Sequence, residues 1–279
     1  MNTAISIKNI SYSYDNSIVL KDLSFDIKKG DFFIIIGPNG SGKTTLMKIF
    51  AGIIKNRTGQ LKIFNKFIKS YPKKSLAKII AFVPQMIPLN FPFTVIELVL
   101  MGRSPYLGIL GFAQQKDMDI AMKAISFAGV EHLINRKINE LSGGECQRVF
   151  IAKAICQEPE IILLDEPTAS LDLAHQIKTM DLMEKLQEEK GLTVVMVSHD
   201  INLAAMYGTS LLLLKNGEIV NIGAPEDVLT FKTLEGAYGC KLLVDQSPIG
   251  KFIRVTPVPQ RYIKWYETKW INNRQAVTE

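Results

Sequence analysis

The chain of 279 residues is poor in cysteine and has no apolar run long enough to cross a membrane. Its three cysteines, Cys146, Cys156 and Cys240, lack the spacing of metal ligands, and their odd number favours reduced thiols over a disulfide framework. Its main apolar runs, such as Phe32–Ile36, are four or five residues long, whereas a spanning helix needs about 20. The first residues lack a basic region followed by an apolar stretch, so no secretory signal is expected. These absences argue against a disulfide scaffold and a fused transmembrane protein.

The charge of the chain is unevenly distributed. The net charge is +6, and the segment Cys240–Glu279 contains seven Lys/Arg but only three Asp/Glu. The same segment holds both tryptophans of the chain, Trp265 and Trp270, with Tyr262 and Tyr266 nearby. Basic residues interleaved with aromatics are typical of surfaces that bind nucleic acid or an anionic membrane. They are equally compatible with a small C-terminal element that docks its aromatics on the domain and leaves its lysines in solvent.

The order of apolar and amphipathic segments predicts the fold class. Short apolar runs alternate with stretches of helix length, which is typical of an α/β domain with a largely parallel central sheet and helices on both faces. Near the N-terminus, Ile5–Ile7, Ser24–Ile27 and Gly59–Ile63 alternate as half-exposed antiparallel strands do. Between about Phe91 and Glu158 the strand signals become rare, which predicts an inserted helical subdomain.

Residues 37 to 44 form the most informative motif in the chain. They read Gly-Pro-Asn-Gly-Ser-Gly-Lys-Thr, a phosphate-binding loop, between an apolar strand-like run and the helix-compatible Thr45–Phe50. The glycines let backbone N–H groups turn toward phosphate oxygens, and the helix start adds partial positive charge. Lys43 is expected to reach the β- and γ-phosphates, and the hydroxyl of Thr44 to hold Mg²⁺. The residues expected to bind the nucleotide here are Gly37, Pro38, Asn39, Gly40, Ser41, Gly42, Lys43, Thr44 and Thr45.

A second apolar run ends in two carboxylates. Ile161–Leu164 is followed by Asp165 and Glu166, and a buried parallel strand would deliver both to the sheet edge where ligands bind in α/β folds. Asp165 is suited to the Mg²⁺ shell, and Glu166 to polarising the water that attacks the γ-phosphate. The alternative is a strand that ends in a solvated turn, which the phosphate loop upstream disfavours.

The third motif is Ser142-Gly143-Gly144-Glu145. Ser142 and Glu145 have the spacing of a capping box, so a helix is predicted to begin here. Two glycines in a first turn weaken that helix, since each costs about 1 kcal/mol relative to alanine. They leave amide groups accessible, and together with the serine hydroxyl they form a second anion-binding element.

With these motifs the chain resembles the ATP-binding cassette family over about residues 3 to 240, which leaves 241 to 279 as a short basic, aromatic C-terminal extension. The resemblance implies a P-loop ATPase that uses ATP and Mg²⁺. It also implies that Ser142, Gly143 and Gly144 act in trans: two copies pair head to tail, and each signature closes on ATP held by the partner's phosphate loop.

The family pattern assigns further positions. Tyr14 matches the aromatic that stacks on adenine, although an ordinary sheet tyrosine is the alternative. Gln85 matches the glutamine that contacts Mg²⁺ and water and senses the membrane partner, and His199 matches the histidine at the γ-phosphate. The loop Ser170–Asp172 matches the one that crosses the dimer interface. Cys146 departs from the family, which commonly has a polar residue there, without an expected effect on phosphate binding.

Three segments resemble the importer branch for ferric siderophores, haem and cobalamin: Phe91–Tyr106, Leu171–Gln176 and Ser198–Ala204. ATPases for free zinc or manganese are similar enough to remain an alternative. The segment Met101–Tyr106 is predicted to lie in the helical subdomain and to face the permease, whereas an amphipathic helix with a loop is the simpler interpretation.

The resemblance therefore implies a homodimer of ATPase subunits that energises two integral-membrane permease subunits. The chain would lie peripherally at the cytoplasmic face of the inner membrane, would reach a substrate-binding protein only indirectly, and would not touch the transported substrate. A soluble ATPase stimulated by nucleic acid, with the basic C-terminal segment as its contact, is the rival from another class.

Overall fold

The computed structural model describes residues 3–15, 17–55, 58–85, 92–108, 111–169, 171–250 and 252–263. Its centre is a six-stranded sheet in the order β10-β9-β3-β8-β7-β6, parallel throughout except for the antiparallel edge strand β10. The bounds of its strands are β3 Phe32–Ile36, β6 Ile80–Val83, β7 Ile161–Asp165, β8 Thr193–Val197, β9 Ser210–Lys215 and β10 Glu218–Gly223. The predicted α/β fold with a mostly parallel sheet is confirmed.

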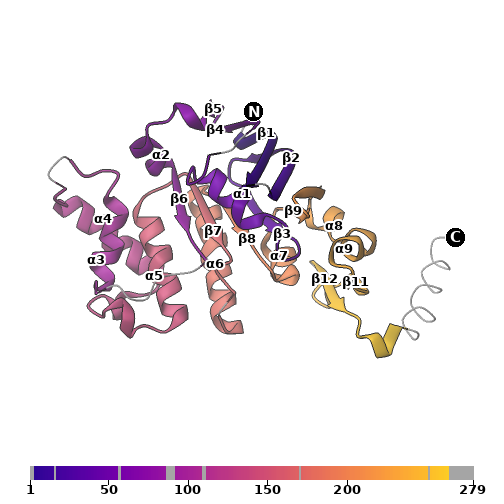
Figure 1. Cartoon of the computed structure of the whole chain (residues 1–279). Coiled ribbons are helices and arrows are strands. Elements are labelled where there is room, and N and C mark those ends of the chain that lie inside the picture. The colour runs from indigo at the N-terminus through magenta and orange to yellow at the C-terminus, as the bar shows by residue number, and fades with distance from the viewer. Residues whose placement is uncertain are drawn as a thin grey trace.

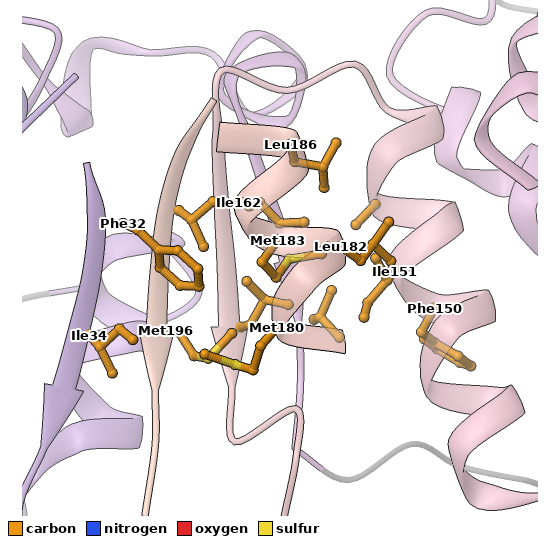
Figure 2. Packing of buried hydrophobic residues seen from close by; sticks show 14 of the residues in the cluster. Phe32, Ile34, Phe150, Ile151, Ile162, Met180, Leu182, Met183, Leu186 and Met196 are labelled. Atoms are coloured by element: carbon orange, nitrogen blue, oxygen red, sulfur yellow. The ribbon is translucent and has the colours of Figure 1, made fainter. Parts of the chain in front are cut away.

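Both faces of this sheet are covered, because successive side chains of a strand point to opposite sides. Every residue of β3, β7 and β8 is buried. Figure 2 shows Phe32 and Ile34 of β3 and Met196 of β8 on the face that packs against Met180 and Met183 of α6. The alternate residues of the same strands enter a second buried cluster with helix α1 and the antiparallel sheet. This burial explains why the runs are continuously apolar instead of alternating.

Nine α-helices accompany the strands in the described part of the chain. Their bounds are α1 Lys43–Phe50, α2 Lys73–Ile79, α3 Val95–Leu100, α4 Gln115–Phe127, α5 Gly143–Cys156, α6 Leu173–Lys190, α7 Ile201–Tyr207, α8 Pro225–Val228 and α9 Phe231–Tyr238. Helix α6 packs against β8, and α5 lies beside α6 and contacts the edge strand β6 (Figures 1 and 2). Helix α6 ends at Gly191, whose φ of 61° gives the left-handed cap that glycine adopts without strain.

The N-terminal part forms a separate four-stranded antiparallel sheet, as the alternating pattern predicts. Its order is β2-β1-β4-β5. The bounds are β1 Thr3–Tyr14, β2 Ser17–Lys28, β4 Gln60–Ile63 and β5 Lys66–Phe67. Its buried face supplies Ile5, Ile7, Leu23 and Ile27 to the cluster that also contains α1. The sheet therefore covers the phosphate-loop helix from outside (Figure 1).

Helices α3, α4 and α5 pack on one another to one side of the sheet, between β6 and β7 in the chain (Figure 1). The described residues of this stretch form no strand, in agreement with the predicted helical character. The first helix begins with a capping box in which Thr94 and Glu97 bond reciprocally.

Arg103 is a buried cation in this helical subdomain. Its guanidinium donates to Asp117 at 3.0 Å, to Glu158 at 2.8 Å and to the carbonyl of Cys156 at 2.9 Å. It also stacks on the ring of Tyr106, 3.9 Å from the centroid. These contacts join the segment after α3 to the start of α4 and the end of α5. The Arg103 side chain thus points into the subdomain. That the segment Met101–Tyr106 faces the permease stays a prediction.

The described part of the C-terminal extension is a hairpin of β11 (Leu242–Gln246) and β12 (Ile253–Pro257). It packs on the domain through aliphatic side chains, since Leu242, Val244 and Val255 belong to the main buried cluster. Tyr262 is 48% exposed, whereas Trp265, Tyr266 and Trp270 lie outside the described residues.

We predict that Arg103→Ala lowers the free energy of unfolding by about 3 kcal/mol, because it leaves the largely buried carboxylate of Asp117 without its cation. Urea denaturation followed by circular dichroism measures the change. Lys21→Ala, which removes an exposed ion pair with Glu218, is the matched control and should cost less than about 1 kcal/mol. Equal losses in the two variants would contradict a structural role for the buried cation.

Candidate functional site

The candidate site lies where β3, β7 and β8 end at the same edge of the sheet. The loop after β3 runs into α1 and is held close to the sheet. Gly37 and Gly42 have φ values of 145° and 100°. A Cβ at Gly37 would overlap the carbonyl oxygen of Leu214, and one at Gly42 would overlap the side chain of Leu20. These two positions therefore require glycine for both conformation and space.

The start of α1 has the features of an anion site. Its N-cap, Gly42, makes no side-chain capping bond, and the first turn contains no acidic residue. Next to it, the hydroxyl of Ser41 is buried and has no hydrogen-bond partner among the described groups. Lys43 is buried as well, and its ammonium donates to the carbonyls of Gly37 at 2.9 Å and Pro38 at 3.0 Å. An uncapped helix start, an unpartnered hydroxyl and a cation together fit a bound phosphate chain.

Burial changes the protonation equilibria at this edge. It lowers the pKa of Lys43, and the nearby carboxylates of Glu166 and Asp165 oppose that shift. It raises the pKa of Asp165, which the hydroxyl of Thr44 opposes by donating to Asp165 at 3.1 Å. The carboxylate and the hydroxyl are thus adjacent, and both supply oxygen atoms, the ligands that Mg²⁺ prefers.

Glu166 follows Asp165 with a backbone φ of 52°, a left-handed conformation that costs an ordinary residue on the order of 1 kcal/mol. Its amide donates to the carbonyl of Val197 at 3.2 Å, which joins the end of β7 to the end of β8. The side chain is only 8% exposed. One carboxylate oxygen contacts Nε2 of His199, and the other accepts from the side-chain amide of Gln85. Three residues predicted separately are thereby brought together.

A cavity of about 490 Å³ lies in front of these groups. It is lined by Val19, Asn39, Gly40, Ser41, Gly42, Lys43, Thr44, Thr45, Gln85, Glu166 and His199. Tyr14 does not line it: its ring is 44% exposed at the end of β1 and meets the ring of Tyr12 edge to face. Stacking of Tyr14 on adenine therefore stays a prediction, and Val19 of β2 is a lining residue that no motif indicated.

The Ser-Gly-Gly motif lies at the start of α5, as predicted. Ser142 is the N-cap: its hydroxyl accepts from the amide of Glu145 at 3.3 Å, and the Glu145 carboxylate accepts from the amide of Ser142 at 2.8 Å. Gly143 is exposed, with nothing within 4 Å of a Cβ placed on it. Cys146 is buried behind them, and burial raises the pKa of its thiol to about 11. The exposed amides lie at the surface, and none of Ser142, Gly143 and Gly144 lines the 490 Å³ cavity.

Asp172 belongs to the same surface as this motif. It caps α6 by accepting from the amide of His175 at 2.9 Å, and it contacts Nδ1 of the same ring at 2.8 Å. A Cβ on Gly144 would lie 3.1 Å from the ring of His175, so that ring packs against the signature turn. Ser170 lies outside the described residues. His175 was not predicted as a site residue, although its spacing of three from Asp172 is a typical helix-cap signal.

The sequence model described as ABC transporter matches residues 20–169, more than half of the chain. This chain belongs to the ABC transporter family. This chain, which we call the ABC subunit below, is 37% identical over 242 residues to the petrobactin import ATP-binding protein FpuC of Bacillus anthracis. The match covers 87% of this chain and 89% of the relative. It is 40% identical over 237 residues to the hemin import ATP-binding protein HmuV of Gloeobacter violaceus, covering 82% and 85%.

Solved structures show the same family. A chain from a structure described as an inward-facing metal-chelate type ABC transporter superposes on the ABC subunit with a TM-score of 0.83, at 31% identity over 94% of this chain and 99% of that one. A dimeric post-hydrolysis ATP-binding cassette with ADP and Pi superposes with a TM-score of 0.70, at 36% identity over 79% and 98%. The ABC subunit is an ATPase. None of its described helices is both long and apolar enough to cross a membrane.

We predict that Lys43→Ala lowers the affinity for ATP on the order of 100-fold, because loss of a buried charge that pairs with phosphate costs roughly 2–5 kcal/mol. Titration with a fluorescent ATP analogue measures the change, and circular dichroism checks that the variant is folded. Lys55→Ala, which removes an exposed lysine beyond α1, is the control and should bind ATP normally. Retained affinity in Lys43→Ala would contradict the assignment of the loop.

Proposed function

We propose that the ABC subunit hydrolyses ATP to drive the import of metal chelates of the ferric siderophore, haem or cobalamin type through separate permease subunits. The observation that carries the chemical part is the convergence of Lys43, Asp165 and Glu166 at one sheet edge, with His199 and Gln85 on the two oxygens of Glu166. The transport part is supported by relatives whose names state petrobactin, hemin and ferric enterobactin transport.

The predicted site residues at this sheet edge have proposed tasks. Lys43 and the amides of the loop from Gly37 to Thr44 hold the phosphates. Thr44, Asp165 and Gln85 would hold Mg²⁺, which when bound would neutralise charge that develops on the phosphate oxygens. Glu166 orients and deprotonates the attacking water. His199 keeps the Glu166 carboxylate in place and reaches the γ-phosphate.

Hydrolysis by this arrangement requires a second copy of the chain. Ser142 and Gly143 are exposed at the surface, whereas the phosphate loop lines the 490 Å³ cavity, which neither of them lines. One chain alone therefore does not bring the two motifs together. Head-to-tail pairing would place Ser142, Gly143 and Gly144 of one protomer on ATP bound to the other. Asp172, adjacent to that motif through His175, would then lie in the interface.

The proposed assembly has two ATPase subunits and two integral-membrane permease subunits, with the ABC subunit at the cytoplasmic face of the inner membrane. A substrate-binding protein communicates with it only through the permeases, and the chelate never contacts this chain.

The test is uptake of a labelled ferric chelate and labelled cobalamin, side by side, in cells that express the native permease. We predict that one ligand accumulates with the wild-type subunit and not with Glu166→Gln, because the amide cannot accept a proton from water. In the purified Glu166→Gln protein, ATP binding is retained and hydrolysis falls at least about 100-fold.

The matched control is Glu188→Gln, which makes the same exchange on the exposed surface of α6 and should leave uptake unchanged. Near-normal hydrolysis by Glu166→Gln would reassign the catalytic base. Full hydrolysis by the wild type without uptake of either ligand would instead contradict the substrate class, and free zinc or manganese would be tested next. Stimulation of hydrolysis by DNA or RNA would favour the nucleic-acid rival.

A further inference from the structure

The C-terminal hairpin packs against the segment that carries His199. Strand β12 contacts helix α7, and α7 begins two residues after His199. The segment is short: β8 ends at Val197, and Asp200 is already the N-cap of α7. Any element that fixes the first turn of α7 therefore also fixes the backbone from which the His199 ring reaches Glu166.

Asn202, in that first turn, bonds to β12 through both ends of its side-chain amide. Its Oδ1 accepts from the amide of Val255 at 2.8 Å, and its Nδ2 donates to the carbonyl of Val255 at 3.1 Å. Both groups belong to one residue of an edge strand, and Asn202 binds them as a neighbouring strand would. Only one orientation of the amide satisfies both bonds, so its side chain is held without freedom to flip.

From Asn202 the hydrogen bonds continue to Asp200 and Ser198, the two residues on either side of His199. The carboxylate of Asp200 accepts from the amides of Asn202 at 2.8 Å and Leu203 at 3.0 Å. The amide of Asp200 in turn donates to the hydroxyl of Ser198 at 3.1 Å. His199 thus lies between two residues that are bonded to each other, in a turn that Asn202 ties to the hairpin.

The hairpin packs tightly on the domain, whereas a cavity separates the His199 ring from the hairpin. Leu242 and Val255 are buried in the main core. Between the hairpin and the catalytic edge lies a cavity of about 420 Å³, lined on one side by Glu166, Thr168 and His199 and on the other by Leu242, Val255 and Pro257. The His199 side chain is 41% exposed and contacts Glu166 through Nε2, so its backbone must hold the ring at that carboxylate.

We infer that Asn202 is a positioning residue for ATP hydrolysis. Through Asn202, the C-terminal hairpin fixes the backbone of residues 198–200, so that the His199 ring stays in contact with Glu166. The inference rests on the proposed role of His199. It gives the described part of the C-terminal extension a task within the ATPase: the hairpin supports the turn of residues 198–200 that carries His199. The Asn202 amide is the connection between the hairpin and that turn; we call this support the brace.

Asn202→Ala in the full-length chain tests this assignment. Turnover should fall roughly 10-fold, because small displacements of groups at a reaction centre have large effects on rate. The KM for ATP should change less than about twofold, since the phosphate loop is untouched. Arg254→Ala is the control: it alters the residue next to Val255 and breaks the surface pair of Arg254 with Asp245, but leaves both bonds to Asn202. It should hydrolyse ATP normally.

A spectroscopic measurement separates positioning from a general loss of structure. The chain has three histidines, so the imidazole signal of His199 can be assigned by its loss in His199→Ala. In Asn202→Ala that signal should shift or broaden while those of His132 and His175 stay in place. If Asn202→Ala does not fold, Asn202→Asp keeps the shape and one of the two bonds, and the same changes are expected from it.

The outcomes are distinct. Normal turnover in the Asn202 variants, or an unmoved His199 signal, overturns the inference. Full turnover in His199→Ala overturns instead the proposed role of His199, on which the inference depends. Reduced turnover together with a selective change at His199, absent from Arg254→Ala, supports the brace.

Discussion

The burial of opposite charges at one edge of an apolar sheet is the constraint on which the site depends. Lys43 and Asp165 are almost fully buried, and the side chain of Glu166 nearly so. Such groups are tolerated only where they compensate one another, because isolated charges lose their hydration on burial. The parallel order of β3, β8 and β7 provides that compensation, since it brings three strand ends together and joins them by the bonds from Glu166 to Val197 and from Ser198 to Ile35. The arrangement of Lys43, Asp165 and Glu166 therefore depends on the order of the strands in the sheet.

The motif proposed as a second phosphate-binding element lies in a different place and is held by different contacts. It is the exposed start of α5, supported by a capping box and by the His175 ring, at the junction of the helical subdomain and α6. Within that subdomain, Arg103 joins α4 to the end of α5 through Asp117 and Glu158. The proposed function gives one chain two complementary half-sites that lie apart. Under that proposal, ATP binding would join two copies of the chain, and their separation after hydrolysis would let a transporter cycle.

Local patterns predicted the parts of the site that depend on local geometry. The glycines of the phosphate loop, the carboxylates after Ile161–Leu164 and the cap at Ser142 all follow from rules that operate within a few residues. The order of strands does not, because β3, β7 and β8 are similar apolar runs and nothing in them states that β8 lies between the other two. Family resemblance could therefore suggest that Gln85 and His199 share a site with Glu166, whereas their contacts with its two oxygens depend on the strand order.

Contacts between distant segments were the least predictable. Arg103 gave no sign of burial, since a lone arginine after a helix is usually solvated. The basic character of the C-terminal segment drew attention to its aromatics, whereas the described hairpin docks through Leu242, Val244 and Val255. The bond of Asn202 to β12 joins residues 53 positions apart and has no signature in the sequence.

The most direct test of two half-sites is complementation between two inactive subunits. Lys43→Ala lacks a functional phosphate loop, and Ser142→Arg blocks the signature. In a mixed dimer, however, the intact loop of one subunit faces the intact signature of the other. We predict that mixing equal amounts restores up to about a quarter of wild-type ATPase activity, since half of the dimers are mixed and each has one complete site. No recovery at any mixing ratio, although mixed dimers form, would contradict sites completed in trans.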